Sequence, residues 1–177
     1  MWLVVIIATL ALPLFWFNAY RVDYQYEKAI GSYIENAYEV NTPDRMIAEI
    51  EKAIAGMKMV LSPENYGAMW FKKPDNKMSW QYDFLDSVIE RAQSVQIWYD
   101  NVYKEGSQNT ESLGDVYEQK MDNLREFLKE NGRADWIAKD AWYVKFHPFY
   151  YFAFLTSLIW SIVLMILWSI AITISEE

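Results

Sequence analysis

The chain has 177 residues, a net charge of −8, a single histidine and no cysteine. An acidic chain repels phosphate backbones, so nucleic acid is not expected as a partner. The lack of cysteine excludes disulfides, iron–sulfur clusters and thiol chemistry. One histidine excludes the four-helix di-iron pattern and makes a histidine-based zinc site implausible.

The charges are distributed unevenly along the chain. Residues 1–20 and 148–175 carry no charged side chain, whereas all 16 Lys and Arg, and every acidic residue except Glu176 and Glu177, lie between them. Because roughly 20 apolar residues in a helix cross a bilayer, both stretches are predicted to be transmembrane helices with aromatic anchors at their ends. A cleaved signal peptide is the alternative for the first stretch, although it lacks the usual basic residues. A buried core helix is the alternative for the second.

Two spans would place both termini on the same side of a membrane. The positive-inside rule favours a cytoplasmic position for the residues between the spans, because the flanking basic residues all lie on that side: Arg21, Lys28, Arg133, Lys139 and Lys145. The opposite side stays open, since long loops translocate largely regardless of charge and Asp23 and Glu27 lie beside these basic residues.

Residues 21–133 are predicted to form an acidic helical bundle. Apolar residues recur there at alternating steps of three and four, the spacing of helix faces packed as in coiled coils, and predict helices at 21–40, 43–61, 79–104 and 110–131. Thr42 and Pro43 are typical of a helix start. Short connections favour antiparallel neighbours. The predicted fold is therefore all-α: two transmembrane helices flanking an antiparallel four-helix bundle, with a short interfacial helix.

The connection at 62–78 contains an apolar tip followed by two lysines. Trp70 and Phe71 suit the lipid headgroup boundary, and Lys72 and Lys73 suit anionic lipid. We therefore expect the loop to enter the bilayer interface or a partner's groove. The alternative is that Trp70 and Phe71 fold back over the base of the bundle.

Residues 134–147 are predicted to be the interfacial helix, amphipathic and aromatic, lying on the bilayer. A partner-binding face is the alternative. The predicted contact residues in and after it are Trp136, Trp142, Tyr143, Phe146, Tyr150 and Tyr151. In the second span, Ala153, Ser157 and Ser161 recur at every fourth position, which indicates a packing strip for the first span, a second copy or another subunit.

No sequence motif points to catalysis or to a cofactor. The chain has no P-loop, Rossmann, EF-hand or serine-elbow pattern, and the predicted spans lack the ionisable groups of transport pathways. We therefore expect a protein that is not an enzyme and that binds no cofactor or metal. The predicted role is an accessory or structural subunit, or a scaffold, of a larger membrane complex. Its expected partners are the lipid bilayer and other membrane-protein subunits or a second copy. The alternative is a membrane-anchored sensor or ligand-binding bundle that signals laterally.

Overall fold

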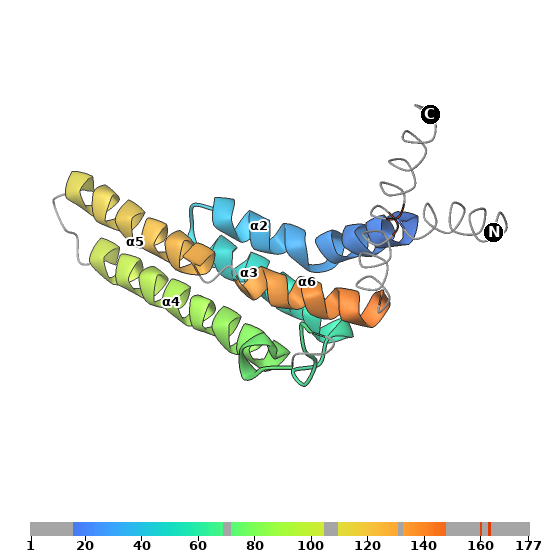
Figure 1. Cartoon of the computed structure of the whole chain (residues 1–177). Coiled ribbons are helices and arrows are strands. Elements are labelled where there is room, and N and C mark those ends of the chain that lie inside the picture. The colour runs from blue at the N-terminus through green and yellow to red at the C-terminus, as the bar shows by residue number, and fades with distance from the viewer. Residues whose placement is uncertain are drawn as a thin grey trace, which may run out of the picture.

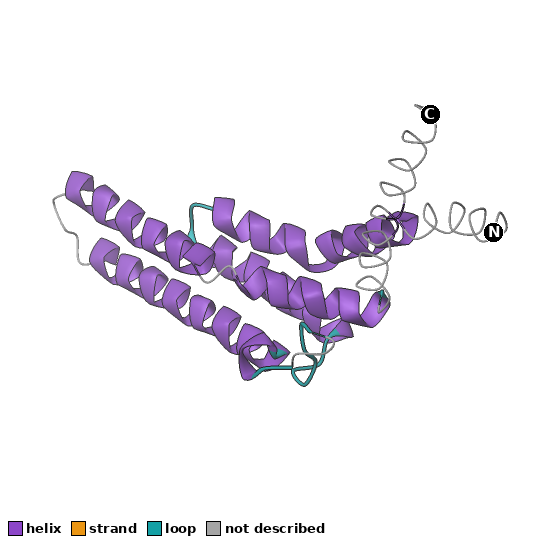
Figure 2. Ribbon diagram, in the orientation of Figure 1, coloured by secondary structure: helices purple, strands orange, loops and turns teal. Residues whose placement is uncertain are grey.

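The computed structural model describes residues 16–68, 72–104, 110–130 and 133–147, together with Trp160 and Val163. These residues are mostly helical and form no strand, as Figure 2 shows. Residues 16–26 are helical and continue without a break into the next element. The elements in chain order are η1 (Glu27–Gly31), α2 (Ser32–Glu39), α3 (Pro43–Val60), η2 (Pro74–Asn76), α4 (Met78–Lys104), α5 (Thr110–Glu130) and α6 (Arg133–Phe146).

The predicted all-α character of the bundle is confirmed for these residues. The starts and ends of α3, α4, α5 and α6 agree with the predicted helices to within one residue. Thr42 is extended and stands directly before Pro43 at the first position of α3, which a proline favours because it has no N–H to satisfy. One feature was not predicted: η1 is a π-helical turn between residues 16–26 and α2.

The helices pack side by side along a common direction (Figure 1). Residues 16–39 form a first column, and α3 returns antiparallel beside it. Next, α4 packs on α3, and α5 returns along α4. Beyond residues 131–132, which the structure does not describe, α6 runs toward the end of the bundle where the first column begins, and it contacts α4. The fourth position of the bundle is therefore filled by two successive helices, α5 and then α6.

The structure places α6 inside the bundle, which corrects the expectation of an interfacial helix on a bilayer. Ile137, Ala138, Ala141 and Trp142 are all at most 6% exposed and belong to the same hydrophobic core as α3 and α4. An amphipathic helix needs a cover for its apolar face. Here the cover is the first column and α4.

The prediction of two membrane-spanning helices is corrected as well. Within the part of the chain that the structure describes, no helix is long and apolar enough to cross a membrane. Residues 1–15 and nearly all of 148–175, on which the prediction rested, lie outside the described residues. The integral-membrane assignment therefore has no structural support. The predicted membrane localisation depended on those spans and is therefore wrong. The same holds for the predicted roles as a membrane-complex subunit or a membrane-anchored sensor.

The connection between α3 and α4 is fastened to both helices. The amide of Gly67 donates to the carbonyl of Asn76 at 2.8 Å, and the amide of Met78 donates to that of Asn65 at 2.9 Å. The hydroxyl of Tyr82 donates to the carbonyl of Leu61 at 2.8 Å, and burial raises the pKa of Tyr82 to about 12. Whether Trp70 and Phe71 fold back lies outside the described residues.

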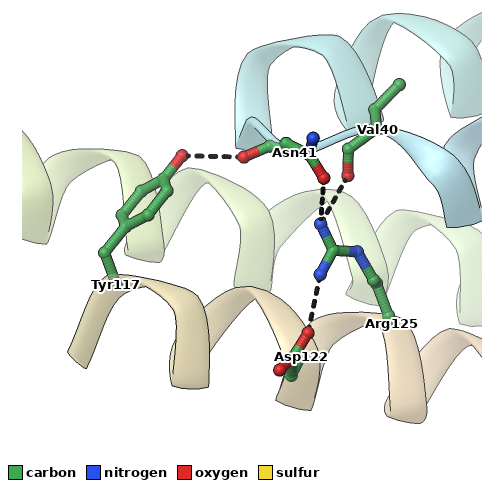
Figure 3. A network of polar contacts seen from close by, with 5 residues as sticks. All are labelled: Val40, Asn41, Tyr117, Asp122 and Arg125. Atoms are coloured by element: carbon green, nitrogen blue, oxygen red, sulfur yellow. Dashed lines mark hydrogen bonds and ion pairs between the residues drawn. The ribbon is translucent and has the colours of Figure 1, made fainter. Parts of the chain in front are cut away.

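At the other end of the bundle, a polar network joins α5 to the α2–α3 turn (Figure 3). The Arg125 guanidinium donates to the Val40 carbonyl at 3.0 Å and to the Asn41 side chain at 2.7 Å. It also pairs with Asp122 at 2.6 Å, and the Tyr117 hydroxyl donates to the Asn41 carbonyl at 3.2 Å. The turn carbonyls that α2 leaves unpaired therefore receive their hydrogen bonds from α5.

A glycine sets the distance between α3 and the first column. A Cβ atom on Gly56 of α3 would overlap the carbonyl oxygen of Ala29 in η1. Only a residue without a side chain therefore allows this approach of the two backbones. Gly114 of α5 differs, because a Cβ atom there would meet no atom within 4 Å.

These two glycines predict opposite effects of alanine. Gly56→Ala should destabilise the protein by about 3 kcal/mol, because the overlap is with backbone that has no freedom to rotate away. Gly114→Ala should stabilise it by about 0.5–1 kcal/mol, through the better helix propensity of alanine. Guanidinium unfolding measures both values. Equal stability of Gly56→Ala and wild type would contradict the close approach.

Candidate functional site: an aromatic and acidic cleft

The start of the first column carries four large aromatic side chains that the bundle does not cover. Trp16, Phe17, Tyr20 and Tyr24 are 58%, 68%, 71% and 59% exposed. Residues 16, 20 and 24 succeed one another at four-residue steps and so share one helix face, with Phe17 beside them. Contiguous exposed apolar surface of this kind marks interaction sites in proteins. We call these four residues the aromatic stripe.

Beside the stripe, an ion-pair cluster ties α6 to the first column. The Lys139 ammonium lies 2.9 Å from a carboxylate oxygen of Asp23 and 3.2 Å from one of Glu27. The Tyr143 hydroxyl donates to Asp23 at 3.1 Å. The Lys139 ammonium also lies 5.6 Å from the centre of the Tyr26 ring, within cation–π range. Two carboxylates, one hydroxyl and one aromatic ring thus come together where α6 meets the first column.

The cluster keeps Lys139 charged. Burial alone would lower the pKa of its ammonium, but the hydrogen bonds to Asp23 and Glu27 outweigh burial and raise the pKa of Lys139 above its ordinary value. The stabilisation that this raised pKa brings is present below the ordinary lysine pKa and is lost only as the pH rises through the folded-state value. The ion pairs are therefore intact throughout the neutral range.

An open cleft of about 500 Å³ lies between the first column and α6. It is lined by Trp16, Ala19, Tyr20, Asp23, Lys139, Asp140 and Tyr143. Burial raises the pKa of the Asp140 carboxyl, and the nearby Lys139 charge only partly opposes this shift. Because Lys139 is shared by Asp23 and Glu27, the carboxylates here outnumber the cations. A carboxylate held in a place that disfavours its charge is a common mark of a functional site.

The contact residues predicted from the sequence are scattered by the structure. Tyr143 lines the cleft, Trp142 is buried behind it and Phe146 is 42% exposed at the end of α6. Lys72 and Lys73 lie in the α3–α4 connection, where Lys72 stands 5.5 Å from the Tyr66 ring and lines a separate pocket with Ala141, Val144 and Lys145 of α6. The side chain of Trp136, and the residues Trp70, Phe71, Tyr150, Tyr151, Ala153, Ser157 and Ser161, lie outside what the structure describes.

Sequence reasoning did not assemble this cleft. From the sequence, Trp16 and Tyr20 are predicted anchors at the end of the first span, and Asp23 and Lys139 are charges that flank the two spans. A usable signal was present, since Asp23 and Glu27 lie one turn apart on one helix, and Lys139 and Tyr143 lie one turn apart on another. Residues one turn apart share a helix face, so the two pairs can meet where these helices pack together.

Known proteins provide no template for this site. No protein-family model, curated protein or solved structure matches the chain. Among the residues that the structure describes, no group of three or more His, Cys, Asp or Glu side chains is placed to hold a metal ion. The function is therefore argued from the cleft itself.

The raised pKa of Asp140 predicts a stabilising substitution. Since the folded-state pKa lies above the ordinary value of 3.8, ionised Asp140 costs stability at neutral pH, and the cost vanishes below pH 3.8. Asp140→Asn should therefore be more stable than wild type at pH 7, with an advantage that shrinks as the pH falls toward 4. Urea unfolding across this range measures it.

The matched control is Asp115→Asn, which removes the same charge from an exposed position on α5. It should leave stability within about 0.5 kcal/mol of wild type, as for most surface substitutions. An Asp140→Asn variant less stable than wild type at pH 7 would show that the carboxylate is stabilised, not strained, in the cleft.

Proposed function

We propose that the protein is a non-enzymatic helical binding module whose cleft accepts a lysine or arginine side chain from an apolar segment of a partner protein. The observation that carries this proposal is the joint lining of one open cleft by aromatic rings and by Asp140. The aromatic stripe at the cleft's edge supplies the surface for the apolar part of the segment.

The chemistry of the cleft favours a cationic group over other ligands. A carboxylate that burial destabilises gains most from a cation that approaches it, because the pair forms where water screens it weakly. Trp16, Tyr20 and Tyr143 offer ring faces, to which ammonium and guanidinium groups are attracted. An anion would instead meet Asp23 and Asp140.

The stripe favours a protein segment over a small molecule. Tyr and Trp are enriched at protein interfaces and among the few residues whose truncation costs most binding free energy. The stripe runs along two turns of helix, with Trp16 and Tyr20 in the lining of the cleft and Phe17 and Tyr24 outside it. An amphipathic helix with a basic residue among apolar ones matches both surfaces, as in helix-in-groove recognition.

Two model peptides test the proposal. A short amphipathic helix of leucine and lysine, labelled for fluorescence anisotropy, should bind the 177-residue chain, and a leucine–glutamate helix of the same pattern should bind about tenfold more weakly or not at all. Asp140→Asn should weaken binding of the lysine peptide about tenfold, the effect of losing one charge-assisted hydrogen bond. Tyr20→Ser should weaken both peptides, since it removes apolar surface.

Asp115→Asn again supplies the control, because it changes the net charge by the same amount outside the cleft. If the Asp115→Asn and Asp140→Asn variants weakened peptide binding equally, the effect would come from long-range attraction, and binding in the cleft would be refuted. Equal affinity for the two peptides would refute the cationic ligand. Binding to phosphatidylcholine vesicles without binding to either peptide would refute a protein segment as the partner.

A further inference from the structure

The far ends of α4 and α5 extend past the rest of the bundle. Figure 1 shows both helices reaching beyond the α2–α3 turn. The contacts agree with this, because the turn residues Val40 and Asn41 meet α5 at Tyr117 and Arg125, whereas α5 begins at Thr110. We call residues 93–104 and 110–120 the arm.

The fully buried part of the hydrophobic core ends where the arm begins, and Val95 and Tyr117 of the arm are partly buried against it. Ala92 is the last buried residue of α4, and Met121 is the first buried residue of α5 among the described side chains. None of the side chains described in the arm is buried. The two helices nevertheless contact each other, with the rings of Tyr99 and Tyr117 4.9 Å apart and the Lys120 ammonium 4.8 Å from the ring of Trp98.

One face of the arm continues the core-facing surface of the bundle. On α4, Val95 and Tyr99 follow Ala92 at steps of three and four, and Gln96 lies one turn after Ala92. On α5, Tyr117 precedes Met121 by one turn, and Gly114 precedes it by two turns. We call this face the shelf, formed by Val95, Gln96, Tyr99, Leu113, Gly114 and Tyr117.

The shelf differs from its surroundings in charge and in shape. None of its six residues is charged, although the chain as a whole has a net charge of −8. A Cβ atom on Gly114 would have no neighbour within 4 Å, so the backbone of α5 is open to close approach there. Close approach of helices commonly uses such a small residue.

We propose that the shelf binds the shelf of a second copy of this chain. Along the bundle, the corresponding face of α4 and α5 is covered by a helical hairpin, namely the first column and α3. The arm of a second copy is itself a helical hairpin. Two arms related by a two-fold axis therefore supply each other with the missing pair of helices and complete a four-helix unit.

The distribution of charge is compatible with self-association at the shelf. Two copies with a net charge of −8 repel each other wherever acidic faces meet. The six residues of the shelf carry no charge and therefore add no repulsion of their own. Asp100, at the edge of the shelf, accepts a hydrogen bond from Gln96 at 3.0 Å, so the neighbouring carboxylate is engaged within its own chain.

The dimer is expected to be weak. Arm helices of this length span about 18 Å, and a pair of them buries on the order of 1,000 Å² in total, below the standard interface size. The dimer should therefore form at high concentration and dissociate on dilution.

Sedimentation equilibrium of the 177-residue chain over about 1–500 µM tests the proposal. Wild type should shift reversibly from monomer to dimer. Gly114→Glu should weaken the dimer about tenfold or more, because it fills the open position and sets two like charges against each other. The same substitution should not lower the melting temperature, since Glu is a better helix former than Gly.

Ile97→Glu is the matched control. Ile97 is 60% exposed and lies on the opposite side of α4 from Val95 and Tyr99, two residues from each. It adds the same charge to the same arm and should change the dissociation constant less than about threefold. A monomer at every concentration, or equal weakening by both glutamates, would overturn the proposal.

Cysteine cross-linking locates the contact. Because the chain has no cysteine, a single Gly114→Cys variant should form a disulfide-linked dimer on mild oxidation. A Met59→Cys variant, at a residue 84% exposed on α3, should not. Cross-linking of Met59→Cys alone would place the contact elsewhere and refute the shelf.

Discussion

The backbone contact between Gly56 and Ala29 fixes the position of the first column on α3. At this spacing, the buried side of the first column enters the core through Tyr26, Ile30 and Ile34. Its neighbouring side is then presented to α6, where Asp23 and Glu27 meet Lys139. What remains is a third side, the aromatic stripe, which no described helix covers. The candidate site is thus a consequence of how tightly two helices pack on the opposite side.

The way the helices fill the positions of the bundle explains its two ends. Four helices and the first column occupy four positions, because α5 and α6 share one of them. At one end, α6 leaves an open cleft against the first column. At the other end, α4 and α5 extend past their neighbours, and residues on the core-facing side of both helices are not fully covered there. Each end is therefore an unfinished packing surface, but only the cleft combines exposed rings with a disfavoured carboxylate.

Local patterns in the sequence were sufficient to predict where the helices lie, but not what packs against each helix. The three-and-four spacing and the Thr42–Pro43 start placed four helices correctly. The same spacing gave no information on what covers a helix, since the apolar face of α6 is equally suited to lipid and to a protein core. The spacing of apolar residues does not distinguish the π-turn η1 from an α-helical turn. The pairing of Asp23 with Lys139 depends on the rotation of two helices that are remote in sequence.

The central claim is that burial disfavours the charged form of the Asp140 carboxyl group, so that the group favours a cation bound beside it. The pKa of its carboxyl group, measured by carbon-13 NMR with and without the leucine–lysine peptide, tests this claim most directly. We expect a value above the ordinary 3.8 in the free protein and a clear fall when the peptide binds, because a cation stabilises the ionised form. A pKa that starts at the ordinary value, or that does not change in the complex, would contradict the account.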